Sequence, residues 1–187
     1  MTEQENVLST RIPSWKFVEI EKKVVNLYTE QKIRRVPINP FEIIQKRGYI
    51  LIPFSEVCGR HCQEYINEES DAFSFYSPEK KTYVIVYNSK KPMYRVRFTL
   101  MHELGHIELG HRTESDLARK LADYYAGYAL APSPLIGKCS SADIISIAST
   151  FEVSYECADI CCYRYHNWRQ QGNVLKDYEK DLINLFN

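Results

Sequence analysis

Two histidines four residues apart, His102 and His106, occupy the middle of the chain, and Glu103 directly follows the first of them. In an α-helix, residues four positions apart leave the same face, one turn apart. Both imidazoles would then present their nitrogens at the spacing that a tetrahedral Zn²⁺ requires. Glu103 would point about 100° away from His102, so it could stay off the metal and accept a proton from water. The sequence therefore predicts a helix that carries a metal site.

The alternative is that this H-E-x-x-H pattern, which is typical of zinc peptidases, occurs here by coincidence. The surrounding segment argues against coincidence, because residues 96–109 are mostly apolar and contain no proline, as in a largely buried helix. Gly105 weakens a helix, so its presence between the two histidines indicates close packing against another element. We therefore favour the zinc site.

The composition favours one domain and gives no sign of a nucleic-acid or membrane partner. A chain of 187 residues is long enough to bury a substantial core. Its 24 basic and 24 acidic residues cancel, so no global charge attracts nucleic acid or a membrane surface. No apolar run is long enough to span a bilayer, and residues 1–6 are polar and acidic, unlike a signal peptide. We expect a cytoplasmic protein.

The six cysteines, at positions 58, 62, 139, 157, 161 and 162, are expected to be free thiols, because the chain shows no export signal. Cys58 and Cys62 form a C-x-x-x-C pair, as do Cys157 and Cys161. Zinc knuckles usually have two intervening residues instead of three, so no second, structural zinc site is predicted.

Hydrophobic periodicity and turn residues predict an α+β fold. In chain order, helices come first, a small sheet follows, and further helices complete the chain. Three β-rich segments are expected at 49–54, 72–76 and 82–87, of which the last two form a hairpin. Helices are expected to start at Ser14, to follow Pro40 up to Gly48, and to cover 97–111, 114–130, 141–150 and 154–168. A final amphipathic stretch follows at 174–186. Residues 1–187 would form a single domain, with a catalytic core at 13–132 and a C-terminal helical part at 133–187.

The central segment resembles the signature of the ImmA/IrrE metallopeptidases. The likeness lies in R-x-R-F-T-L-x-H-E-L-G-H-x-x-L-G-H at 95–111, in A-D-Y-Y-A at 122–126 and in L-A-P at 130–132. The resemblance implies a minimal zincin-like, gluzincin-like fold, in which a small three-stranded sheet packs against the H-E-x-x-H helix. It also implies a zinc-dependent endopeptidase whose substrate is a regulatory protein, such as a phage or mobile-element repressor.

The sequence departs from this family at the third metal ligand. The resemblance implies a glutamate two or four residues before Asp123, but these positions hold Leu121 and Arg119, and neither side chain can bind a cation. Asp123 is the nearest carboxylate on the matching helix face and is our first candidate, although in gluzincins such an aspartate more often orients a zinc-bound histidine. Further candidates for the third ligand are Glu114, Asp116 and His111. If none of these residues completes the site, the two histidines alone would hold zinc weakly.

These observations predict a Zn²⁺-dependent endopeptidase in which His102, His106 and Asp123 hold the metal. Glu103 would be the general base and then the proton donor to the leaving amine. An edge strand near Thr82–Tyr87 is expected to hold an extended substrate by β-augmentation. The first alternative is a degenerate, non-catalytic member of the family that binds a regulatory protein.

A second alternative is a DNA-binding regulator that uses the C-terminal helices, because residues 147–154 resemble the entry to a helix-turn-helix. Ser154 is expected to cap the start of the helix that follows it. This helix opens with Glu156 and Asp159, however, and phosphates would repel both carboxylates. A packing helix is favoured here, and no nucleic-acid partner is expected.

Overall fold

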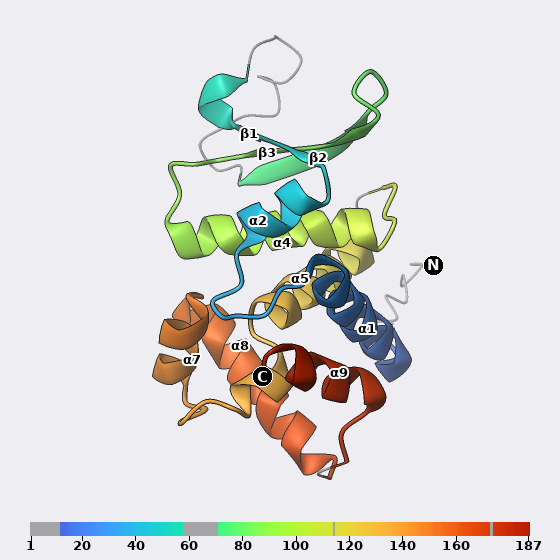
Figure 1. Ribbon diagram of the computed structural model, residues 1–187. Helices are drawn as coiled ribbons and strands as arrows, with labels where there is room; N and C mark the ends of the chain where they lie inside the picture. The colour runs from blue at the N-terminus through green and yellow to red at the C-terminus, as the bar shows by residue number, and fades with distance from the viewer. Residues whose placement is uncertain (1–11, 58–70, 114, 173) are drawn as a thin grey trace, which may run out of the picture.

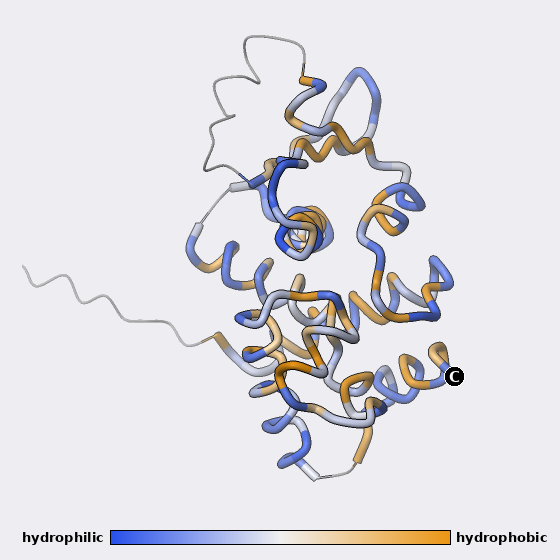
Figure 2. The backbone as a smooth tube through the Cα atoms, turned by 90° about the vertical axis from the view of Figure 1, so that its left-hand side faces the viewer, coloured by the Kyte–Doolittle hydropathy of each residue, from blue (hydrophilic) through white to orange (hydrophobic). Residues whose placement is uncertain are grey.

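A small sheet lies across one long helix, and most of the other helices gather on the far side of that helix (Figure 1). The computed structural model describes residues 12–57, 71–113, 115–172 and 174–187. Figure 2 shows the long helix, α4 (Met93–Glu108), end-on between the sheet and the helical half of the molecule. The architecture is α+β, with the three-stranded sheet that the sequence predicted.

The sheet has the strand order β1–β3–β2. β2 (Ala72–Ser77) and β3 (Thr82–Tyr87) pair antiparallel and form the predicted hairpin. β1 (Ile50–Pro53) pairs with β3 in parallel on the other side, so β3 is the central strand. β2 packs against α4, and Ser74 of this outer strand contacts Glu103, the residue that follows His102.

The expectation that Thr82–Tyr87 is an edge strand is therefore wrong. Val84 is opposite Ile50 of β1 on one side and Phe75 of β2 on the other. Three successive residues of β3, from Val84 to Val86, are buried, which is typical of a strand that is covered on both faces. Among the described residues, the outer strand beside α4 is β2.

Side-chain caps fix the starts of several helices, because each accepts a hydrogen bond from a backbone N–H that the helix leaves unpaired. Asn39 caps α2, Ser115 caps α5, Asp143 caps α7, and Ser154 caps α8 as its position in the sequence suggested. The helices outside α4 are α1 (Ser14–Gln31), α2 (Pro40–Lys46), α5 (Asp116–Leu130), α6 (Ser133–Ile136), α7 (Ile144–Phe151), α8 (Tyr155–Gln170) and α9 (Asp177–Leu185), with a 3₁₀ turn, η1, at Phe54–Glu56.

One hydrophobic core connects the N-terminal, central and C-terminal helices. A polar contact also joins them, because Glu21 of α1 accepts hydrogen bonds from Tyr124 of α5 at 2.6 Å and from Tyr178 of α9 at 2.5 Å. Residues far apart in the sequence are thus tied together around α1. No helix in the described part of the chain is long and apolar enough to cross a membrane.

Four of the cysteines, Cys139, Cys157, Cys161 and Cys162, are free thiols, as predicted. Cys157 and Cys161 are buried, and the other two are half-buried. The predictions for the cysteines at positions 58 and 62 lie outside the described residues.

Candidate active site

The two histidines of α4 direct one nitrogen each toward the same point. Nε2 of His102 lies 3.0 Å from Nε2 of His106. Two nitrogens that each lie about 2.0–2.1 Å from a tetrahedral Zn²⁺ would be about 3.3 Å apart, so the observed spacing is close to the one that the metal needs. The chemistry and direction of these two donors fit a zinc ion.

Asp123 of α5 contacts His102 from the opposite side of the ring. Its Oδ1 lies 2.8 Å from Nδ1 of His102. A carboxylate at this position accepts the Nδ1–H and leaves the lone pair of Nε2 available, which is how a carboxylate orients a metal-binding histidine. The geometry therefore places Asp123 at Nδ1 of His102, the ring nitrogen that faces away from His106. The prediction that Asp123 is the third metal ligand stays a prediction, and this contact does not support it.

The two other candidates that the structure describes, His111 and Asp116, are not brought to the two Nε2 atoms either. Nδ1 of His111 lies 3.1 Å from Nδ1 of His106, again on the side of the ring that faces away from the partner histidine. Burial lowers the pKa of His111, and the nearby His102 lowers it further. Asp116 is exposed at the start of α5, and Glu114 lies outside the described residues.

Within the described ranges, no group of three or more histidine, cysteine, aspartate or glutamate side chains is arranged to hold a metal. Leu121, at one position where the resemblance implies a glutamate, is half-buried and packs against the hydrophobic core. Arg119, at the other position, is exposed. The described part of the site thus supplies two convergent imidazole nitrogens and a carboxylate that contacts one of the two rings.

Glu103 is held by the outer strand of the sheet. Its Oε2 accepts a hydrogen bond from the hydroxyl of Ser74, in the middle of β2, at 2.6 Å. Such charge-assisted hydrogen bonds are short and fix the direction of the carboxylate. Nothing in the local sequence identified Ser74, because its contact with Glu103 depends on how the sheet packs on α4.

Gly105 allows α4 and α5 to approach closely between the two histidines. A Cβ at this position would lie 3.1 Å from Cβ and Cδ1 of Tyr125, which is fully buried. The close packing that the glycine indicated is therefore with α5. This contact also brings Asp123, two residues before Tyr125, within reach of His102.

A cleft of about 790 Å³ opens beside these residues. His102 and Glu103 of α4 line it together with Asp123 of α5. Its opposite wall belongs to α8, which contributes Cys161 and Arg164 among others. Substrate pockets in proteins usually have volumes of about 300–1,000 Å³, so the cleft is large enough for a short peptide segment.

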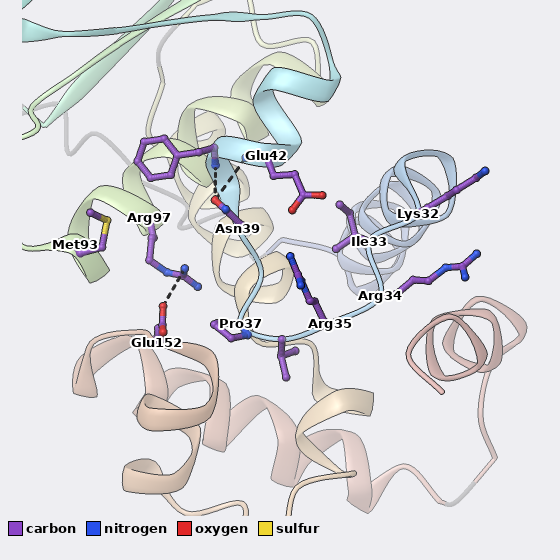
Figure 3. Close-up of a pocket in the computed structure, with 12 residues that line it drawn as sticks. Lys32, Ile33, Arg34, Arg35, Pro37, Asn39, Glu42, Met93, Arg97 and Glu152 are labelled. Carbon is purple, nitrogen blue, oxygen red and sulfur yellow. Dashed lines mark hydrogen bonds and ion pairs between the residues drawn. The ribbon is translucent and has the colours of Figure 1, made fainter.

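A second cavity, of about 940 Å³, lies where the chain after α1 meets α2 and the first turns of α4 (Figure 3). Figure 3 shows Arg97 of α4 directed at Glu152, and the two side chains form an ion pair at 3.2 Å. Arg97 also donates a hydrogen bond to the carbonyl of Phe151 at 3.1 Å. This cavity contains none of the predicted site residues, and Arg97 ties α4 to the end of α7.

Comparisons with known proteins identify the family and the fold. The family model of the IrrE N-terminal-like domain, Peptidase_M78, matches residues 62–162, which include α4 and α5. A transcriptional regulator from Mycobacterium tuberculosis is similar in structure, with a TM-score of 0.53 and 16% sequence identity, over 75% of this chain and 45% of that one. At this identity the likeness shows a common fold alone, and the chain spans less than half the length of the regulator.

No curated protein matches the chain. The family model covers more than half of the residues and includes both histidines, Glu103 and Asp123. The chain therefore belongs to the Peptidase_M78 family of IrrE N-terminal-like domains, a family of metallopeptidases.

Proposed function

We propose that this protein is a zinc-dependent endopeptidase that cleaves a regulatory protein in the cleft between α4 and α8. The observation that carries the proposal is the 3.0 Å approach of the two Nε2 atoms of His102 and His106. The contact of Asp123 with Nδ1 of His102 also supports the proposal, because it leaves Nε2 available for a metal. Glu103 lines the same cleft and is not needed as a ligand. Membership of a metallopeptidase family supports the same reaction class.

His102 and His106 would hold the metal, with Asp123 keeping His102 in the required tautomer. When bound, zinc would polarise the scissile carbonyl and make water a stronger nucleophile at neutral pH. Glu103 accepts the proton of the attacking water and delivers it to the nitrogen of the leaving amine. The Ser74 hydrogen bond holds the Glu103 carboxylate in one direction during both transfers.

β2 is the strand that would bind the substrate, in place of the strand expected from the sequence. An outer strand can pair with an extended peptide through its free backbone groups. Ser74 lies in the middle of β2 and contacts Glu103, so a peptide paired with this strand would pass the general base. Ala72 of the same strand lines the cleft.

The test compares the wild type with Glu103→Gln on a peptide library made from a digested bacterial lysate, with new termini identified by mass spectrometry. We expect cleavage by the wild type and a rate at least about 100-fold lower for Glu103→Gln, because the proton acceptor is lost. Zinc content, measured by elemental analysis, should be the same in both. Glu79→Gln, at an exposed position in the hairpin turn, is the control and should cleave normally. Equal cleavage by Glu103→Gln would contradict the assigned base.

The second candidate function is a non-catalytic module that binds a regulatory protein. The observation in its favour is that Leu121 and Arg119 stand where the third ligand is expected, while the described residues place no third ligand together with the two Nε2 atoms. Wild-type protein that holds stoichiometric zinc, or none, and cleaves no peptide of the library would support this candidate.

A further inference from the structure

Arg164 of α8 carries a charge that no ion pair in the described part of the chain neutralises. Its guanidinium carbon lies over the ring of Tyr124, 4.3 Å from the centroid. The described residues give the guanidinium neither a hydrogen bond nor an ion pair, and its buried Nη1 has no partner. Arg95, another arginine of the same cleft, differs in this respect, because it forms a two-pronged ion pair with Asp71, with Nη2 2.7 Å from Oδ2.

The neighbouring helix is shaped to admit this guanidinium. A Cβ at Gly127 of α5 would lie 2.8 Å from Nη1 of Arg164, so any larger residue at this position would displace the arginine. Gly127 lies four residues after Asp123, and residues four apart share a helix face. Gly127, against which the guanidinium packs, therefore lies one helical turn from Asp123, the residue that contacts His102, and Arg164 lines the same cleft as both.

Each described carboxylate of the cleft either contacts a residue other than Arg164 or lies far from Arg164 along α8. Asp71 pairs with Arg95, Asp123 contacts His102, and Glu103 accepts from a serine hydroxyl. Glu156 also lines the cleft, but it stands eight residues before Arg164 on α8, which corresponds to about 12 Å along the helix axis. A half-buried guanidinium without an anion is unfavourable, so its surroundings favour a ligand that brings one.

We propose that Arg164 determines substrate specificity by binding a carboxylate of the peptide, from either an acidic side chain or the C-terminus. The choice of a peptide as the ligand rests on the proposed function. A guanidinium suits a carboxylate because its planar N–H groups can donate two parallel hydrogen bonds to the two oxygens. Carboxylate binding would also place the peptide against α8, opposite the α4 wall that carries His102.

Three matched peptides test this proposal and separate the two sources of the carboxylate. They are acetyl-Ala-Glu-Ala-amide, the uncharged acetyl-Ala-Gln-Ala-amide, and acetyl-Ala-Gln-Ala with a free C-terminus. Each is titrated into the full-length wild-type protein while the side-chain Nε–H resonance of Arg164 is followed by ¹⁵N NMR. The titration needs neither bound metal nor cleavage, so its outcome is independent of whether the protein proves to be a peptidase.

We expect at least one charged peptide to bind about tenfold more tightly than the uncharged peptide and to shift the Arg164 resonance. The peptide with the glutamate identifies a side-chain carboxylate, and the peptide with the free C-terminus identifies a terminal one. Arg164→Gln should abolish the preference, whereas Arg169→Gln, an exposed arginine on the same helix, should keep it.

Equal binding of the three peptides by the wild type would overturn the proposal, as would failure of both charged peptides to shift the Arg164 resonance. A preference that persists in Arg164→Gln would overturn it as well. If Arg164→Gln does not fold, the wild-type titration decides the outcome alone, because it reports directly on the guanidinium.

Discussion

Nδ1 of His102 lies 2.8 Å from Oδ1 of Asp123, while Nε2 of the same ring lies 3.0 Å from Nε2 of His106. The two nitrogens of an imidazole point in divergent directions, so Asp123 can influence a metal at Nε2 through His102 without touching it. This relationship separates two roles for Asp123 that the sequence left open, the third ligand and the residue that orients His102. The two roles predict different losses of metal affinity.

Asp123→Ala is expected to weaken zinc binding by about 10–100-fold, because His102 would lose the partner that fixes its tautomer and direction. His102→Ala should lose far more, since a ligand itself is removed. Competition against a chromophoric chelator measures both dissociation constants, and Asp123→Asn, which keeps an oxygen beside Nδ1, should lie close to the wild type. If Asp123→Ala lost zinc as completely as His102→Ala, Asp123 would be a ligand.

Ser74→Ala is expected to slow peptide cleavage about tenfold without changing zinc content, because Glu103 would lose the hydrogen bond that holds its carboxylate in place. The rate is measured on a peptide that the library experiment identifies. Ser77→Ala, at the far end of the same strand, is the matched control, since its hydroxyl contacts only the backbone N–H of Lys80 in the hairpin turn among the described residues. An unchanged rate in Ser74→Ala would show that this contact does not serve the reaction.

Gly105→Ala is expected to lower the free energy of unfolding by about 1 kcal/mol. Alanine favours a helix over glycine by about 1 kcal/mol, but overpacking a core costs about 1–3 kcal/mol, and the buried Tyr125 ring has little room to move. Urea denaturation measures the change. Gly137→Ala, where a Cβ would meet its neighbours at ordinary distances of 3.4 Å or more, should be close to neutral. A stabilised Gly105→Ala variant would contradict the close contact between α4 and α5.

Asp143→Asn is expected to remove a pH-dependent part of the stability. Hydrogen bonds from Ser141 and Ser146 lower the pKa of Asp143 from 3.8 to about 2. Because the folded-state pKa is below the unfolded value, the ionised form favours folding, and its contribution is complete above pH 3.8 and disappears as the pH falls to about 2. The difference in melting temperature between the wild type and Asp143→Asn should therefore shrink across this range. A difference in melting temperature that stays constant down to pH 2 would refute the proposed contribution of the ionised Asp143 to stability.

Local patterns in the sequence were enough to predict much of the fold. The spacing of His102 and His106, the cap at Ser154 and the turn between β2 and β3 are all set by residues close together in the chain, and all three appear in the structure. The four-residue helix α6 was not predicted, because so short a segment has no measurable periodicity.

The rest depends on contacts between distant segments. The parallel pairing of β1 with β3 makes β3 central, and no feature of residues 82–87 alone specified which strand would join it. The contact between Ser74 and Glu103, and the place of Arg164 beside Gly127, arise in the same way from the packing of β2 and α8 around α4 and α5. These contacts require the assembled tertiary structure.

The close approach at Gly105 has a consequence for how the site forms. The two convergent Nε2 atoms come from α4, but the carboxylate that contacts Nδ1 of His102 comes from α5, and the two helices meet where Gly105 contacts Tyr125. Separating the helices would take Asp123 away from His102 even if α4 itself stayed helical. If the two histidines bind zinc as proposed, the zinc affinity would depend on tertiary packing, and a titration with the metal would report whether the two neighbouring helices are docked.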